Sequence, residues 1–350
     1  MSDTIRIGVA GLNWGTQHLS AFAQVEGATI TAIADTDANR LRAAAKDFPG
    51  AQAFESANEL IESGAVDAVV IATPTYLHER QSNHAFDAGL HVLCESPVGI
   101  NGREASHLLT ASGLTGRVFM WSNPLRFDPR VAAAQGAVAE GSVGEVFHAV
   151  ATCRIPGWKH AADAWQLDRD RGGGALLAVA VQTIDAVWYA MGCPDPMEAL
   201  GARFDRFAQN HASGLDAIAE DTMTGMIRFK NGSTLQCVAQ INHPSATGSI
   251  ESEQRLWGVD GALDLVLGQL TDLAGKTRPL AEPPFDSSQG FTAQAAAFLE
   301  AVRSHSEPPT TGKQALSLAK MTDALATSAK EKEAVSIKVE RSLDDLFGAL

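Results

Sequence analysis

The sequence predicts an α/β protein of two domains, the first built on a doubly wound parallel sheet. Apolar strand-like segments alternate with helical segments between residues 5 and 97, as in sheets whose parallel strands are joined by covering helices. The length of 350 residues is also more than one hydrophobic core usually supports. We therefore expect a second domain after the alternating region.

The first strand, helix and intervening turn form the pattern of a dinucleotide-binding site. Residues 5–10 are rich in β-formers, and residues 16–25 have the spacing of a helix with one apolar face. Between them, Gly11 and Gly15 open a tight turn. Glycines at such a turn let the backbone approach a pyrophosphate, whose charge then faces the helix N-terminus.

This turn departs from the usual glycine fingerprint. Asn13 stands where the middle glycine is expected, and Gly15 follows Gly11 by four residues instead of five. A purely structural turn is the alternative. We predict that Gly11, Asn13, Trp14 and Gly15 bind the cofactor.

The second strand, residues 29–34, ends at Asp35, which lies 35 − 15 = 20 residues beyond Gly15. A carboxylate at that distance accepts hydrogen bonds from the adenosine ribose and repels a 2′-phosphate, which favours NAD over NADP. Alternatively, Asp35 caps the predicted helix over residues 38–47. The nearby Arg40 leaves NADP possible, and it is included among the cofactor-binding candidates.

The alternation continues through a predicted helix at residues 57–63, a strand at 68–72, a helix at 80–88 and a strand at 91–94. Ligands of open α/β sheets bind beyond the carboxyl ends of the strands. The loops after the last two strands therefore supply candidate site residues. Those expected to bind the cofactor are Thr73, Pro74, His78, Glu95 and Pro97, and those expected to act in catalysis are Tyr76 and Ser96.

Composition narrows the class of partner. The chain has 27 Lys and Arg against 41 Asp and Glu, a formal charge of −14 that would repel nucleic acid or an anionic membrane. With no basic leader and no apolar stretch of membrane-spanning length, we expect a cytoplasmic protein. No cysteine or histidine pair shows metal-ligand spacing, so we expect no metal and four reduced, mostly buried thiols: Cys94, Cys153, Cys193 and Cys237.

With these residues in hand, the chain resembles the Gfo/Idh/MocA family of glucose-fructose oxidoreductases and inositol dehydrogenases. The resemblance runs along nearly the whole chain. Its landmarks are the glycine turn, Thr73-Pro74 with His78 downstream, the pattern from Ala88 to Pro97, Asn123 to Phe127, Gly141 to Val146, and Gly172 to Leu177 leading to Ile184-Asp185.

The resemblance implies a Rossmann domain over residues 1–122 and a C-terminal α/β domain over residues 123–350. The second domain would contain a large, mostly antiparallel sheet whose outer face commonly pairs subunits, which implies a homodimer or homotetramer. It also adds Asn123 to the cofactor-binding candidates. Local patterns agree with strands at 147–154, 223–229, 233–241, 254–259 and 262–266 and helices at 291–305 and 312–330.

The resemblance also implies a catalytic lysine in Glu-Lys-Pro, and an aspartate and a histidine four residues apart after the Gly-Gly-Gly turn. This chain carries Ser96, Ala178 and Gln182 at those positions. Ala178 has no acid or base group, Gln182 cannot titrate, and Ser96 exchanges protons near neutral pH only with an activating partner. A positioned acid/base group contributes about 100- to 10,000-fold, so these replacements predict an atypical active site.

Other residues are candidates for the missing roles. Lys159 and His160 lie on a loop that, in the family, passes over the substrate, although such a pair is often ordinary solvated surface. Tyr76 and His78 can donate to a carbonyl oxygen, but a hydrogen-bonded histidine at a helix start is the plainer interpretation of His78. We include Gln182 and Ser96 as further candidates.

Two arginines, Arg126 and Arg154, could bind a carboxylate or pair with an acid. We expect His243 at the end of a sheet.

Three functions are compatible with these residues. The first is an NAD(P)-dependent oxidoreductase acting on a sugar, cyclitol or other small cyclic or polyhydroxylated substrate, or on an activated double bond or imine. The second is a catalytically inactive sensor in which NAD or a sugar regulates binding to a partner. The third is a lyase or hydrolase that uses bound NAD transiently. The retained nucleotide landmarks favour the first.

Overall fold

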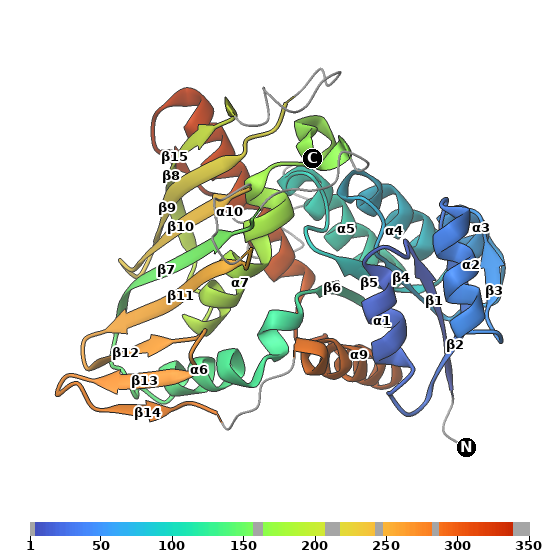
Figure 1. The fold of residues 1–350 in the computed structure, drawn as a ribbon, viewed down its shortest axis with the longest axis horizontal. Coiled ribbons are helices and arrows are strands. Elements are labelled where there is room, and N and C mark those ends of the chain that lie inside the picture. Colours follow the sequence, from blue (N-terminus) through green and yellow to red (C-terminus); the bar gives the residue numbers. More distant parts are fainter. Residues whose placement is uncertain (1–3, 157–163, 207–217, 242–247, 282–286, 339–350) are drawn as a thin grey trace. The chain divides into compact units, whose positions relative to one another are not determined.

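The structure is a computed structural model that describes residues 4–156, 164–206, 218–241, 248–281 and 287–338 (Figure 1). The chain divides into two compact units. The first consists of residues 1–99, 103–127 and 286–316, and the second of residues 100–102, 128–285 and 317–350. The first unit thus includes a segment far beyond the predicted boundary at residue 122.

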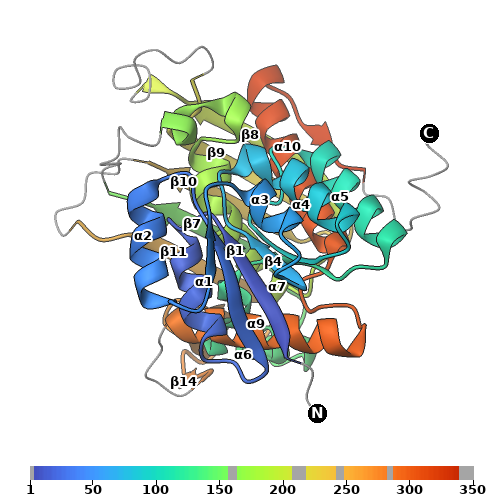
Figure 2. The same ribbon diagram turned by 90° about the vertical axis from the view of Figure 1, so that its right-hand side faces the viewer.

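The first unit contains a six-stranded parallel sheet in the order β3-β2-β1-β4-β5-β6, which is the doubly wound order. Its two central strands, β1 and β4, lie side by side (Figure 2). Its strands are β1 (Ile5–Ala10), β2 (Ala28–Ala34), β3 (Gln52–Phe54), β4 (Ala68–Ile71), β5 (His91–Glu95) and β6 (Phe119–Ser122). Its helices are α1 (Gly15–Phe22), α2 (Ala38–Asp47), α3 (Ala57–Glu62), α4 (His78–Asp87), α5 (Gly102–Thr115) and α9 (Ser287–Ser304).

Burial on both faces stabilises this sheet. Every residue of β4 is buried, as expected of a central parallel strand covered by helices on each side. The late helix α9 packs on α1, where Phe298 meets Phe22 edge to face with ring centroids 6.3 Å apart. The sheet of the first unit therefore depends on a helix that follows it by more than 150 residues in the chain.

The second unit contains a nine-stranded sheet in the order β14-β13-β12-β11-β7-β10-β9-β8-β15. Neighbouring strands are antiparallel except β7 and β10, which run parallel. This confirms the predicted fold class. The strands are β7 (Val146–Arg154), β8 (Pro196–Phe204), β9 (Thr222–Phe229), β10 (Thr234–Gln240), β11 (Glu251–Gly258), β12 (Gly261–Asp264), β13 (Gln269–Asp272), β14 (Thr277–Pro279) and β15 (Val335–Ser336).

Helices cover one face of the nine-stranded sheet. Alternate residues of β7, Ala149 and Ala151, are fully buried against α7 (Val181–Ala190), and α6 (Pro129–Ala139) packs on α7. The expectation of no apolar stretch of membrane-spanning length is wrong, because residues 169–190 are long and apolar enough to cross a membrane; however, 72% of their most apolar window is buried inside the protein. We interpret this stretch as a core helix. The last helix, α10 (Gly312–Glu331), begins in the first unit and continues in the second.

Most differences from the predicted elements lie at their ends. The helix predicted over residues 16–25 ends at Phe22, and the helix predicted to start at residue 80 starts at His78. The strand predicted from residue 254 begins at Glu251, because its pairing with β7 extends that far. Three of the cysteines are buried and Cys193 is half-buried; none of the four forms a disulfide, as predicted.

Candidate functional site

The glycine turn after β1 has a backbone that requires glycine at its first position. Gly11 has φ +89, and a Cβ added there would lie 2.4 Å from the carbonyl oxygen of Ala72. Gly11 also continues the hydrogen bonding between β1 and β2, because its N–H donates to the carbonyl of Ala34 at 2.8 Å. The turn is therefore pressed against the ends of β2 and β4.

The N-terminus of α1 leaves backbone donors unused. The N–H groups of Asn13 and Trp14 donate no hydrogen bond to any described residue, and the Trp14 ring is 48% exposed. Unpaired N–H groups at the start of a helix, together with the helix dipole, form a site for a phosphate group. Gly15, the first residue of α1, packs so closely that a Cβ would lie 2.9 Å from Cγ1 of Val9.

Asp35 is held against this turn. Its Oδ2 accepts the Leu12 N–H at 2.6 Å, and its Oδ1 accepts the Asp37 N–H at 2.7 Å. The alternative that Asp35 caps the following helix is wrong, because Asp37 is the N-cap of α2 and accepts from the N–H groups of Asn39 and Arg40. The Asp35 carboxylate is thus fixed beside the turn, with one further lone pair on each oxygen for a ligand.

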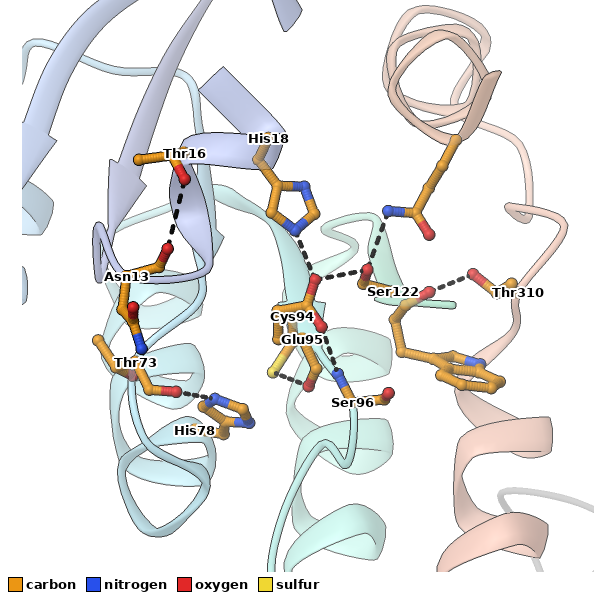
Figure 3. A network of polar contacts seen from close by, with 12 residues as sticks. Asn13, Thr16, His18, Thr73, His78, Cys94, Glu95, Ser96, Ser122 and Thr310 are labelled. Carbon is orange, nitrogen blue, oxygen red and sulfur yellow. Dashed lines mark hydrogen bonds and ion pairs between the residues drawn. The ribbon is translucent and has the colours of Figure 1, made fainter. Parts of the chain in front are cut away.

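His78 joins the two loops that follow β4 and β5. It is 2% exposed, and its Nε2 lies 2.6 Å from the carbonyl oxygen of Thr73 (Figure 3). Its Nδ1 lies 2.8 Å from the carbonyl oxygen of Pro97. Burial lowers the pKa of the ring, and the two carbonyls oppose that shift. A neutral ring has one N–H, so it donates to one carbonyl at a time. This is the plainer interpretation of His78, a hydrogen-bonded histidine at a helix start.

The carboxylate of Glu95 is the centre of a buried polar network (Figure 3). Oε1 lies 2.5 Å from Nε2 of His18 and accepts the Ser122 hydroxyl at 2.7 Å, while Oε2 accepts the Ser96 N–H at 3.2 Å. The Gln294 amide in turn donates to Ser122 Oγ at 2.9 Å. The network ties α1, β5, β6 and α9 together beneath the loop that carries Ser96.

Sequence reasoning missed three members of this network: His18, Ser122 and Gln294. His18 lies one helical turn beyond Gly15, on the apolar face of α1, and a histidine on such a face is a signal for a buried partner. Gln294 and Ser122 are 172 residues apart, and nothing in the sequence joins them.

Ser96 itself presents an unsatisfied hydroxyl. Its Oγ is buried and has no hydrogen-bond partner among the described residues. Ser96 follows Glu95 in the chain, and the peptide bond between Ser96 and Pro97 is cis. An unpaired buried hydroxyl costs about 1–3 kcal/mol unless a ligand or water satisfies it. Ser96 therefore offers a polar group that a ligand or water molecule could satisfy.

The remaining candidates of the first unit lie around these loops. Tyr76 is 38% exposed on the short 3-10 helix at Thr75–Leu77. The Thr73 hydroxyl donates to Oε1 of Gln81 at 2.6 Å, which orients the loop that also contains Pro74. Asn123 is fully buried and caps the turn after β6, where its Oδ1 accepts the Leu125 N–H.

In the second unit, Ala178 and Gln182 are half-buried on the segment after the Gly-Gly-Gly turn. Residues 176–180 form a π-helix and α7 follows, so Ala178 and Gln182 do not lie on one regular α-helix. Glu220 supports the start of this segment: its Oε1 accepts the Leu176 N–H at 3.0 Å, and burial raises the pKa of the carboxyl group.

Three predicted residues, Lys159, His160 and His243, lie outside the described residues. Arg154 pairs with Glu251 on the neighbouring strand, with 3.9 Å between Nη1 and Oε2. Arg126 is 4% exposed, lies over the Trp121 ring at 4.9 Å and donates to Oε1 of Gln314.

In the part of the chain that the structure describes, no three His, Cys, Asp or Glu side chains come together as a metal site would require.

Comparison with known proteins identifies the family. Residues 5–122 match the GFO_IDH_MocA oxidoreductase family, NAD-binding Rossmann fold, and residues 131–264 match the GFO/IDH/MocA C-terminal domain. The chain belongs to the Gfo/Idh/MocA family. This Gfo/Idh/MocA protein is accordingly an oxidoreductase of that family with an NAD-binding Rossmann domain, as the sequence predicted for its cofactor.

Two named proteins are similar to this chain in sequence. The chain is 29% identical over 299 residues to 1,5-anhydro-D-fructose reductase of Ensifer adhaerens, which covers 82% of this chain and 84% of the relative. It is 36% identical over 149 residues to inositol 2-dehydrogenase of Corynebacterium glutamicum, over 42% of this chain and 44% of the relative.

A solved structure of levoglucosan dehydrogenase, in complex with NADH and levoglucosan, shares the fold with a TM-score of 0.84 at 20% identity. The match covers 96% of this chain and all of that chain.

The residues of the first unit fit NAD. The free N–H groups of Asn13 and Trp14 suit the pyrophosphate, the fixed Asp35 carboxylate suits the ribose hydroxyls, and the unpaired Ser96 hydroxyl suits a polar group near the end of β5.

Proposed function

We propose that this protein is an NAD-dependent oxidoreductase that transfers hydride to or from a small polyhydroxylated or cyclic substrate, using acid/base groups other than the family's lysine, aspartate and histidine. NAD supplies the hydride donor or acceptor. The observation that carries the proposal is the glycine turn with the Asp35 carboxylate fixed against it. The names of the relatives, a sugar reductase and an inositol dehydrogenase, support the substrate class.

We assign NAD over NADP on charge. The Asp35 carboxylate, fixed by the N–H groups of Leu12 and Asp37, would repel a 2′-phosphate. Arg40 could favour NADP, but its Nε lies 3.8 Å from Oδ2 of Asp37, which offsets part of its charge. The net charge of Asp35, Asp37 and Arg40, just after β2, is therefore negative.

Proton transfer in this proposal falls to residues that differ from the family pattern. The Ser96 hydroxyl, unpaired among the described residues, can hold a water molecule or the substrate oxygen. Tyr76, Lys159 and His160 are the titratable candidates, and Gln182 can donate a hydrogen bond without titrating.

The test combines binding and turnover. NADH fluorescence titration measures cofactor binding, and reduced-nicotinamide absorbance with a panel of ketoses, inositols and aromatic dihydrodiols measures hydride transfer. We expect saturable NADH binding and turnover of at least one cyclic or polyhydroxylated compound. A protein that does not bind NADH would contradict the proposal.

A variant with Ser96→Lys, Ala178→Asp and Gln182→His tests the atypical site. If the family mechanism was lost only through these three positions, the variant gains sugar or inositol dehydrogenase activity. No gain in rate, with NADH binding retained, favours a pocket that has changed more widely.

The second candidate function is a sensor without catalysis, favoured by the loss of titratable groups at Ser96, Ala178 and Gln182 together. In this case NAD or a sugar would bind without turnover and alter binding to a partner protein. Robust turnover that disappears in Gly11→Ala, which blocks the nucleotide turn, would exclude this function.

We also propose a homodimer or homotetramer formed through the outer face of the nine-stranded sheet. Leu200 and Met226 are neighbours across β8 and β9 and are 48% and 42% exposed, and Phe204 farther along β8 is 57% exposed. Exposed apolar side chains grouped on one sheet face favour burial in an interface. Met226→Asp should dissociate the oligomer in light scattering after size exclusion, whereas Leu273→Asp, on a distant hairpin and 77% exposed, should not.

A further inference from the structure

The first unit contains a pocket at the amino ends of its parallel strands, on the opposite side from the glycine turn. The pocket has a volume of about 570 Å³. Its lining comes from the first residues of β1 and β5, the turn before β2 and the end of α9: Ile5, Glu26, Gly27, His91, Val302, Arg303 and His305. Because NAD is expected at the carboxyl ends of the strands, this pocket at their amino ends is not part of the dinucleotide site.

His91 offers this pocket a fixed hydrogen-bond donor. The side chain is 7% exposed, and its Nδ1 accepts the Val118 N–H at 3.0 Å. Burial is the largest cause that lowers the pKa of the ring to about 4, so the ring is neutral at pH 7. The proton of a neutral ring whose Nδ1 is an acceptor lies on Nε2. That N–H has no partner among the described residues.

Arg303 provides a cation at the rim. Its Nη2 donates to the backbone carbonyl of Glu26 at 3.2 Å, and a Cβ at Gly27 would lie only 1.7 Å from the same atom. Gly27, with φ +79, therefore leaves the space that the guanidinium fills. No described carboxylate forms an ion pair with Arg303, so its charge is available to a ligand.

The surrounding charges favour an anion. Arg117 and His305 both disfavour a positive charge on His91, which shows that their charges reach this site. The nearby Asp67 carboxylate is already paired with Arg6, with 2.7 Å between Oδ1 and Nη2. The Glu26 side chain at the rim opposes a multiply charged anion.

We propose that this pocket binds a small organic carboxylate, held by the Arg303 guanidinium and the His91 Nε2–H. A guanidinium and an imidazole N–H are donors suited to carboxylate oxygens. Ile5 and Val302 line the pocket with apolar surface, which favours an organic body over a bare inorganic ion. Glu26 disfavours a dianion such as phosphate.

The experiment titrates the full chain, labelled with ¹³C at histidine Cε1, with benzoate, acetate, inorganic phosphate and the neutral isostere benzamide. NMR follows the His91 resonance, assigned from His91→Gln, and calorimetry follows the heat. We expect benzoate to saturate at millimolar concentration, to bind more tightly than acetate, phosphate or benzamide, and to raise the pKa of His91.

Arg303→Gln should weaken benzoate binding by roughly tenfold, because one charge-assisted contact is lost, while the matched surface variant Arg278→Gln should not change it. Gly27→Ala displaces the guanidinium and should weaken binding similarly. Gly64→Ala controls for backbone strain, since Gly64 has φ +68 and nothing within 4 Å of an added Cβ.

Three outcomes overturn the proposal: no saturation below about 10 mM benzoate, benzamide or phosphate binding as tightly as benzoate, or affinity unchanged in Arg303→Gln. Because NADH is absent from these titrations, they are independent of the dinucleotide site.

Discussion

His18 Nε2 lies 2.5 Å from Oε1 of Glu95, and the two side chains are only 1% and 6% exposed. The contact joins α1, the helix that begins at the glycine turn, to the end of β5, where Ser96 follows Glu95. A buried pair of this kind contributes little net stability relative to apolar residues, but removing one partner leaves the other buried and unpaired. The pair therefore holds the Glu95 carboxylate at the end of β5, where it also accepts the Ser96 N–H.

His18→Leu should destabilise the protein by about 3 kcal/mol, because the Glu95 carboxylate loses a donor in a buried site. The matched control is His107→Leu: His107 contacts Glu79 at 3.2 Å, but its side chain is 55% exposed, and a loss below about 1 kcal/mol is expected there. Urea unfolding measures both. Equal losses in the two variants would show that burial of the pair is not the source of its importance.

Asp35→Ala should lower NADH affinity by roughly tenfold and reduce the preference for NADH over NADPH, because the carboxylate that fits the ribose and repels a 2′-phosphate is gone. Fluorescence titrations with each dinucleotide measure the ratio.

Asp37→Ala is the matched control for Asp35→Ala. It removes the N-cap of α2 and should cost about 1 kcal/mol of stability, yet leave the ratio of the two affinities unchanged. An unchanged ratio in Asp35→Ala would contradict the role proposed for Asp35.

Gly11→Ala should reduce NADH affinity by at least roughly tenfold, because the added Cβ would meet the Ala72 carbonyl at 2.4 Å and force the turn away from its position. Gly64→Ala carries a similar left-handed backbone penalty, about 1–2 kcal/mol, in open space. Both variants should therefore have a lower thermal unfolding temperature, but only Gly11→Ala should have a lower affinity in the NADH titration. Retained NADH affinity in Gly11→Ala would mean that the cofactor does not use this turn.

The fold was predictable because local patterns determine it. Apolar runs such as residues 68–72 predict buried parallel strands. The strand predicted there is β4, and its observed end differs from the prediction by one residue. The N-cap of α2 could also have been found, because Asp37 immediately precedes the first helical residue, whereas Asp35 lies too early to cap it.

The buried network was not predictable, because its contacts join distant parts of the chain. His18 and Glu95 are separated by 77 residues, and Gln294 comes from a helix that the sequence alone places in the second domain. The left-handed conformation of Gly11 was implied by the turn, but the contact that requires it, with Ala72, depends on the sheet order β1-β4.

Stability should fall as the pH falls from about 6.5 to about 4, in part because of His91. The folded protein lowers the pKa of this ring from 6.5 to about 4, so between these values the unfolded chain binds a proton that the folded chain does not. Unfolding is then favoured by acid, and the contribution amounts to at most about 3 kcal/mol. Buried His78, whose pKa is also lowered, acts in the same direction.

Urea unfolding at several pH values measures this dependence. His91→Gln should flatten the slope, whereas the exposed control His107→Gln should leave it unchanged. Glu220 acts with the opposite sign, because its raised pKa means that the folded state holds a proton more strongly than the unfolded state, and its contribution is lost as the pH rises. A slope that survives intact in His91→Gln would assign the acid sensitivity to other groups.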